Sequence, residues 1–118
     1  MSSRSEHAPA VFTAPERDLI RREFCRHFGQ DPQVAAGIFL RTWHSGPQKG
    51  LPKLPAAVRS MAERGLIEVR KAQMGPGAFF TEAGLTALRQ LLLDRRAMDP
   101  ERFAHLRREL GVEFAGQA

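Results

Sequence analysis

The chain has 118 residues, with 18 lysines and arginines against 13 aspartates and glutamates, and a net charge of +5 at neutral pH. This length suits a single domain with its own core, and one cysteine excludes an internal disulfide or a cysteine-based zinc site. No apolar run approaches the roughly 20 residues of a membrane span, and the polar first residues lack the apolar stretch of a secretory signal. The sequence therefore predicts a small cytoplasmic protein without membrane contact.

The first predicted element is a helix that begins with a capping signal. Residues 1–12 show no periodicity and are expected to form a disordered arm. Thr13 and Glu16 have the spacing of a capping box, with a proline in the first turn. Apolar residues then recur every four positions as far as Phe28, so we expect one helix that ends at Gly29.

A second helix is predicted after Asp31, where an aspartate and a proline again mark a helix start. It would end before the glycine and proline at 46–47. A connector rich in glycine and proline, residues 46–53, then precedes a third helix between Pro55 and Gly65. The apolar face of the second helix would consist of Val34, Ile38, Phe39 and Trp43.

Beyond the third helix, the pattern of apolar residues becomes typical of strands. Residues 66–71 and 78–81, joined by a turn at 73–77, predict a β-hairpin. A fourth helix is predicted from about Glu82 to Met98, and a fifth from Asp99.

Two segments resemble winged helix-turn-helix proteins. Residues 57–69, Ala-Val-Arg-Ser-Met-Ala-Glu-Arg-Gly-Leu-Ile-Glu-Val, resemble the passage from recognition helix to wing in MarR-type and related bacterial transcriptional regulators. Residues 80–84, Phe-Thr-Glu-Ala-Gly, are similar to the strand exit of those proteins. The resemblance implies a mostly α, α+β fold of three helices and a β-hairpin wing, followed by one or two C-terminal helices. The winged-helix domain would cover residues 13–98, with a C-terminal helix and tail at 99–118.

The same resemblance implies a transcriptional regulator that places its third helix in the major groove of duplex DNA and its wing on the backbone. The charge supports such a partner, because residues 49–72 carry six basic side chains against two acidic ones. Lysine can neutralise phosphate, and arginine can bond bidentately to guanine. The predicted DNA-binding residues are Lys49, Lys53, Ala57, Arg59, Ser60, Glu63, Arg64, Arg70 and Lys71.

Regulators of this kind usually bind as homodimers. The C-terminal helices carry more large apolar residues than one small core needs, which favours a dimer interface there. The residues predicted for it are Leu91, Leu92, Phe103 and Leu106.

Two other functions remain open at this stage. A winged-helix module that binds a protein is favoured by the predicted wing tip, residues 74–77, which has no basic residue, and by the few hydrogen-bond donors on the third helix. The net charge permits RNA or nonspecific nucleic-acid binding equally well. Arg59 could also pair with Glu63 one turn later as an ordinary surface contact.

No pattern in the sequence predicts an enzyme, a metal site or a cofactor. The histidines lack the i, i+4 spacing of a helical metal site, and no nucleophile elbow or phosphate loop is present. Cys25 lies beside two phenylalanines of the first helix and is expected to be partly buried, with a redox role left open.

Overall fold

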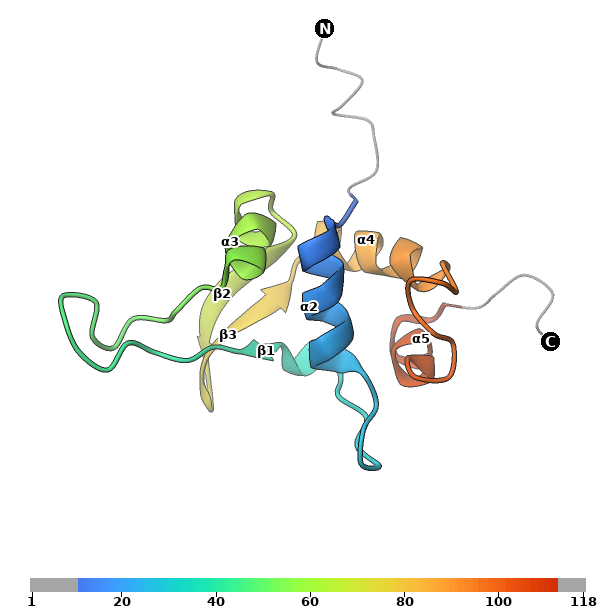
Figure 1. Cartoon of the computed structure of the whole chain (residues 1–118), viewed down its shortest axis with the longest axis horizontal. Helices are drawn as coiled ribbons and strands as arrows, with labels where there is room; N and C mark the ends of the chain where they lie inside the picture. The colour runs from blue at the N-terminus through green and yellow to red at the C-terminus, as the bar shows by residue number, and fades with distance from the viewer. Residues whose placement is uncertain (1–10, 113–118) are drawn as a thin grey trace, which may run out of the picture.

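A computed structural model describes residues 11–112 (Figure 1). This part of the chain is α+β, with four α-helices and one three-stranded antiparallel sheet. Most of the predicted arm, residues 1–10, and most of the predicted tail, residues 113–118, lie outside the described residues. In chain order the elements are α2 (Ala14–Phe24), the 3₁₀ turn η1 (Val34–Ala36), β1 (Ile38–Phe39), α3 (Ala56–Glu63), β2 (Ile67–Ala72), β3 (Gly75–Phe80), α4 (Glu82–Leu92) and α5 (Ala104–Leu110).

Helix α2 begins at the predicted capping box. The Thr13 hydroxyl accepts a hydrogen bond from the Glu16 N–H at 3.3 Å, and the Glu16 carboxylate accepts one from the Thr13 N–H at 2.9 Å. The box satisfies two N–H groups that have no partner within the helix. Phe12 directly before it is buried against Phe80, with ring centroids 6.3 Å apart, so the packed chain begins before the predicted boundary at residue 13.

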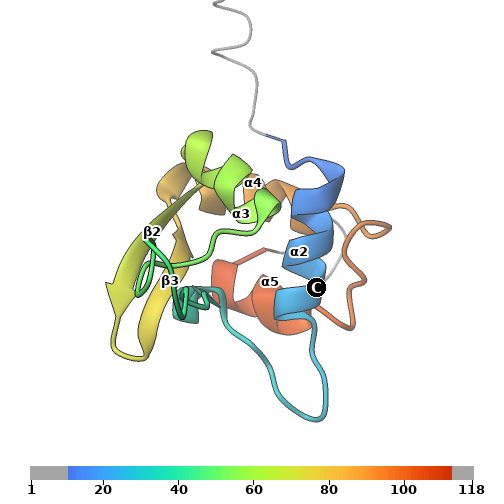
Figure 2. The ribbon, with the colours of Figure 1, turned by 60° about the vertical axis from the view of Figure 1, so that its left-hand side comes forward.

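The prediction that this helix extends to Phe28 is wrong, because the helix ends at Phe24. Cys25 is extended, and the Phe24 carbonyl accepts a hydrogen bond from Nε2 of His105, 2.8 Å away on α5. The chain then turns back through two left-handed residues, Phe28 at φ 49° and Gly29 at φ 74°. Phe28 is consequently 97% exposed at the tip of a loop that points away from α3 and α4 (Figure 2).

The predicted second helix between residues 31 and 44 is also wrong, so two α-helices rather than three precede the hairpin in the described chain. After the single turn η1, Ile38 and Phe39 form β1, and the chain continues as a loop to α3. The side chains of residues 38–40 alternate between buried and exposed, as in a strand. Gly37 allows the change of direction at φ 76°, and a Cβ there would lie 2.6 Å from the Phe79 ring.

The sheet has the order β1-β3-β2, with both pairings antiparallel. β1 pairs through Ile38 with Ala78 and through Phe39 with Gly77. The predicted hairpin is confirmed, although its turn consists of residues 73–74 alone, because 75–77 continue β3. The hairpin tip points away from α3 and α4 in both ribbon views (Figures 1 and 2).

The junction from α3 into the hairpin follows the prediction. Gly65 takes φ 77°, its N–H bonds to Ala62, and the Leu66 N–H bonds to Met61, which together satisfy the last carbonyls of α3. Thr81 caps α4, as predicted, by accepting a hydrogen bond from the Gly84 N–H at 3.1 Å. Its hydroxyl also donates to the Gly65 carbonyl at 2.6 Å, which joins both ends of the hairpin.

The C-terminal helices are shorter than predicted. α4 ends at Leu92, six residues before the expected end at Met98, and α5 begins only at Ala104. Aspartates hold the segment between them in turns: the Asp94 carboxylate accepts hydrogen bonds from two later backbone N–H groups at 3.0 and 3.2 Å, and the Asp99 carboxylate accepts one at 3.1 Å. Such local bonds compete with continued helix.

Three of the four residues predicted for a dimer interface instead fill the core of the chain itself. Leu92 and Leu106 are fully buried and Phe103 is 3% exposed, whereas Leu91 is half-buried at the edge of the core. These three side chains are therefore unavailable to a partner, because the turns between α4 and α5 fold them inward. A homodimer remains a prediction, without this interface.

We expect Glu109→Ala to destabilise the fold by about 1–2 kcal/mol, because Glu109 connects α5 to η1. Its two carboxylate oxygens each accept one hydrogen bond at 2.8 Å, from the N–H groups of Val34 and Ala35. Urea unfolding measures the effect. Glu63→Ala, which removes an exposed carboxylate on α3, is the control and should change stability by about 0.5 kcal/mol or less. Equal losses in the two variants would contradict the assignment.

Candidate nucleic-acid interface

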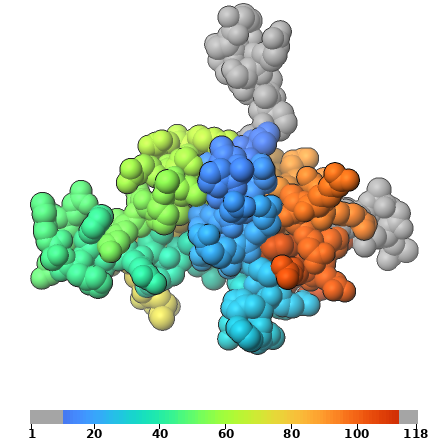
Figure 3. Space-filling model, in the orientation of Figure 1, coloured from blue at the N-terminus to red at the C-terminus, as the bar shows by residue number. Residues whose placement is uncertain are grey.

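The nine predicted DNA-binding residues lie on three neighbouring parts of the fold. Lys49 and Lys53 belong to the loop of residues 41–53, which we call the basic loop, and five residues belong to α3 or its C-terminal end. Arg70 and Lys71 lie on β2. In the space-filling view the basic loop stands out from the body beside α3 (Figure 3).

The basic loop folds back on itself like a short hairpin. The Trp43 N–H bonds to the Leu51 carbonyl at 3.0 Å, and the Lys53 N–H bonds to the Arg41 carbonyl at 2.7 Å. The ammonium group of Lys53 lies 4.8 Å from the centroid of the Trp43 ring, a cation–π contact. Residues 41–55 contain no aspartate or glutamate, so the local charge comes entirely from cations.

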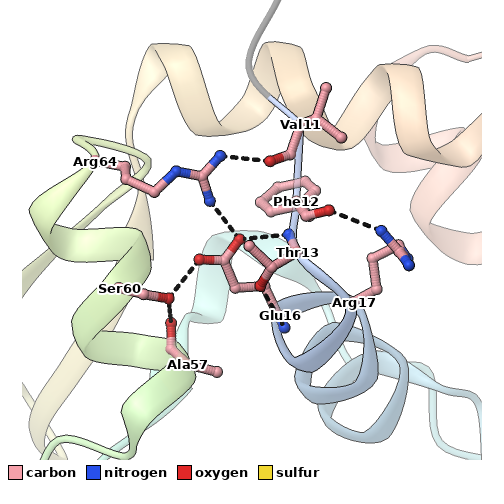
Figure 4. A network of polar contacts seen from close by, with 8 residues as sticks. All are labelled: Val11, Phe12, Thr13, Glu16, Arg17, Ala57, Ser60 and Arg64. Atoms are coloured by element: carbon pink, nitrogen blue, oxygen red, sulfur yellow. Dashed lines mark hydrogen bonds and ion pairs between the residues drawn. The ribbon is translucent and has the colours of Figure 1, made fainter.

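On α3, the structure places Ser60 and Arg64 in an internal network rather than on a free surface (Figure 4). The Ser60 hydroxyl and the Arg64 guanidinium both donate hydrogen bonds to the buried carboxylate of Glu16, the latter at 2.5 Å. Arg64 also donates to the Val11 carbonyl. The two side chains therefore have a structural role, because they fasten α3 to the start of α2, and a contact of either with DNA stays a prediction.

Glu16 is fully buried at the centre of this network. Burial acts to raise its pKa, because it disfavours the charged form. The hydrogen bonds from Ser60, Arg64 and the Thr13 N–H, together with the charge of Arg64, outweigh that effect and hold the pKa of Glu16 below its ordinary value. The sequence showed only the helix-capping role of this carboxylate, since Ser60 and Arg64 lie 44 and 48 positions away.

The remaining predicted residues of α3 differ in accessibility. Ala57 is half-buried against the core, whereas Arg59 and Glu63 are exposed. No ion pair joins Arg59 to Glu63 in the described structure. Arg59 is thus the predicted cation that α3 presents to solvent without an ion-pair partner.

On β2, the Arg70 side chain contacts two neighbouring side chains, whereas Lys71 is exposed. The Arg70 guanidinium lies 3.9 Å from the Phe79 ring centroid and forms an ion pair of 3.0 Å with Glu68. The hairpin tip beyond them presents Met74, which is 85% exposed. β2 therefore adds one readily available cation, Lys71, to those of the basic loop and α3.

A groove of about 650 Å³ lies between α2, β1, the basic loop and α3. Its apolar lining includes core residues and three exposed side chains, Phe39, Trp43 and Leu51. Arg22 and Arg41 line it as well as Lys53 and Arg59. Arg22 and Arg41 were not among the predicted residues. Arg41 lies in a stretch of the sequence without aspartate or glutamate, which could have indicated it, whereas no comparable pattern indicates Arg22.

The described part of the chain has no group of three or more histidine, cysteine or carboxylate side chains placed to hold a metal ion. Within residues 11–112, no helix is long and apolar enough to cross a membrane. Cys25 is a half-buried free thiol at the end of α2. No family model matches the sequence, and neither a curated protein nor a solved structure matches the chain.

Proposed function

We propose that this protein binds duplex DNA as a winged-helix regulator, through phosphate contacts from the basic loop, α3 and β2. The observation that carries the proposal is a group of cations on three adjacent elements that have no ion-pair partner among the described residues. Cations concentrated on one surface favour a polyanionic partner. The group consists of Lys49, Lys53, Arg59 and Lys71.

The order of elements also supports the proposal. A helix, a short strand, a second helix and a hairpin follow one another, and the strand pairs with the far strand of the hairpin. Gly65 and Thr81 occupy the positions expected from the resemblance to winged-helix regulators. The difference lies between residues 31 and 44, where a helix was predicted and the chain instead forms η1, β1 and the start of the basic loop.

This difference bears on how DNA would be contacted. Because α3 offers Arg59 as its accessible donor and no helix lies between α2 and α3, base readout along the major groove would depend on few side chains. Phosphate contacts position a protein without reading sequence. We therefore expect affinity to come from the backbone and to vary little between duplex sequences.

The expected result is a salt dependence that matches four phosphate contacts. With a slope of about −0.9 per neutralised phosphate, raising salt from about 50 to 200 mM should weaken binding about 150-fold. In Lys49→Ala/Arg59→Ala/Lys71→Ala one of the four cations remains, and the same change of salt should weaken binding only about 3-fold. Fluorescence anisotropy of a labelled random duplex measures both dependences.

A matched control removes three charges elsewhere. Arg96→Ala/Arg102→Ala/Arg108→Ala takes three exposed arginines from the segment that contains α5, so the net charge changes by the same amount. Its salt dependence should equal that of the unaltered protein. Absence of binding at 50 mM salt, or equal losses in both triple variants, would overturn the proposal.

A further inference from the structure

The groove between α2 and the basic loop has an apolar interior that the chain does not cover. Its floor consists of buried and half-buried aliphatic residues of three elements and their flanks. Its walls are Phe39, Trp43 and Leu51, which are 64%, 42% and 55% exposed. Large exposed apolar groups that adjoin one another mark binding surfaces more often than isolated ones do. The floor residues are Leu19, Ile38, Leu40, Leu54 and Val58.

The charged side chains around this groove are almost all of one sign. Four cations line it, against one carboxylate, that of Glu23. None of the four forms an ion pair within the described structure. A partner that fills the groove must therefore combine an apolar face with negative charge at its margins. The cations are Arg22, Arg41, Lys53 and Arg59.

We propose that the groove binds an acidic amphipathic helix of a partner protein. The aliphatic side chains of that helix would occupy the floor, and its carboxylates would pair with the cations at the rim. The site lies where the chain lacks the predicted second helix and runs as an extended loop, so a helix supplied by another molecule would pack against β1 and α3. This proposal does not depend on DNA binding, although Lys53 and Arg59 contribute to both surfaces.

The aromatic residues of the groove argue against unpaired nucleobases as its ligand. Bases bind by stacking on open aromatic faces. Lys53 already lies over the Trp43 ring, and the Phe39 ring packs against Gly75, where an added Cβ would be 3.3 Å away. The aliphatic floor offers no surface for stacking, whereas it suits leucine side chains.

The chain provides its own probe of the groove, because Trp43 is its one tryptophan and it has no tyrosine. Two synthetic peptides test the proposal: an 18-residue helix with leucines at i, i+3, i+4 and i+7 and glutamates beside them, and a version with lysines in place of the glutamates. We expect the glutamate peptide to shift Trp43 emission saturably and to bind about tenfold more tightly than the lysine peptide.

Charge reversal gives the sharper test. Arg22→Glu/Arg41→Glu, both at exposed positions, should reverse the preference so that the lysine peptide binds more tightly. Lys49→Glu/Lys71→Glu makes the same change of charge outside the groove, and should keep the preference for glutamate while weakening binding to duplex DNA. Leu51→Ser should weaken binding of the glutamate peptide without altering DNA binding. Far-UV circular dichroism confirms that each variant is folded.

Several outcomes would overturn the proposal. Equal affinity for the two peptides, or an unchanged preference in Arg22→Glu/Arg41→Glu, would show that the rim cations do not select the ligand. A shift of Trp43 emission by oligo(dT), with none by either peptide, would assign the groove to single-stranded nucleic acid instead. Lys49→Glu/Lys71→Glu tests DNA binding, whereas Arg22→Glu/Arg41→Glu tests the groove. A failure of the DNA-binding proposal can therefore be distinguished from a failure of the groove proposal.

Discussion

Replacing Gly84 by alanine should destabilise the protein by about 3 kcal/mol or more, at the upper end of the effects of overpacking. Gly84 lies in the first turn of α4, directly against the backbone at the start of β2. An added Cβ would lie 1.9 Å from the Leu66 carbonyl oxygen and 2.9 Å from its carbon. Since these are backbone atoms, relief requires α4 to move away from the hairpin. Alanine's better helix propensity, about 1 kcal/mol, offsets only part of this cost.

Urea unfolding followed by circular dichroism measures the loss. Thr86→Ala places an alanine in the same helix at an exposed position, and should leave stability unchanged or slightly raised. A Gly84→Ala variant as stable as the Thr86→Ala variant would mean that α4 does not approach β2 so closely.

Replacing Glu16 by alanine should cost about 3 kcal/mol at neutral pH, because three functions end together. The capping box loses its reciprocal bond, Ser60 loses an acceptor, and Arg64 loses its ionic partner. The Arg64 side chain is 36% exposed, so in the variant water can replace part of its lost contact with the Glu16 carboxylate. The cost should therefore fall below that of a fully enclosed ion pair.

The pH dependence separates charge from packing. Because the folded-state pKa of Glu16 is lowered, its ionised form stabilises the fold at pH values above the ordinary value of about 4.5, and this stabilisation disappears as the pH falls through the lowered pKa. Glu16→Gln keeps the shape without the charge. The difference in unfolding free energy between Glu16→Gln and the unaltered protein should thus be largest near pH 7 and shrink below pH 4.5. A difference that stays constant with pH would contradict an ionised Glu16.

The sequence predicted the elements that depend on neighbouring residues. The capping box at Thr13, the left-handed Gly65 after α3 and the Thr81 cap of α4 each involve groups within five positions of one another, so the residue types alone indicate them. The hairpin followed in the same way from its strand pattern and turn residues.

The missing second helix shows where such reasoning fails. Ile38, Phe39 and Leu40 fit a helical face or a strand equally well, since a short apolar run does not determine its period. Their conformation is decided by pairing with Gly77 and Ala78, nearly forty positions away. Phe28 was misplaced for a related reason: α2 ends where His105, from the last helix, binds its final carbonyl.

The sequence marked a region of clustered cations, but it could not show which of their side chains the fold leaves accessible. The spacing on α3 could not show that Ser60 and Arg64 face Glu16. Arg22 lies on α2, far along the chain from the basic loop, so nothing local connected it with Arg41. Only the tertiary fold brings the rim of the groove together.

The sheet order has a consequence for behaviour at high concentration. β2 pairs with β3 on one side only, so its outer edge offers main-chain groups to which a strand of another molecule could bond. Glu68, Arg70 and Lys71 are exposed along this strand. A second copy that paired along this edge would bring the charged side chains of both strands into close contact and remove the water that solvates them. The edge is thus open yet a poor template for fibril growth.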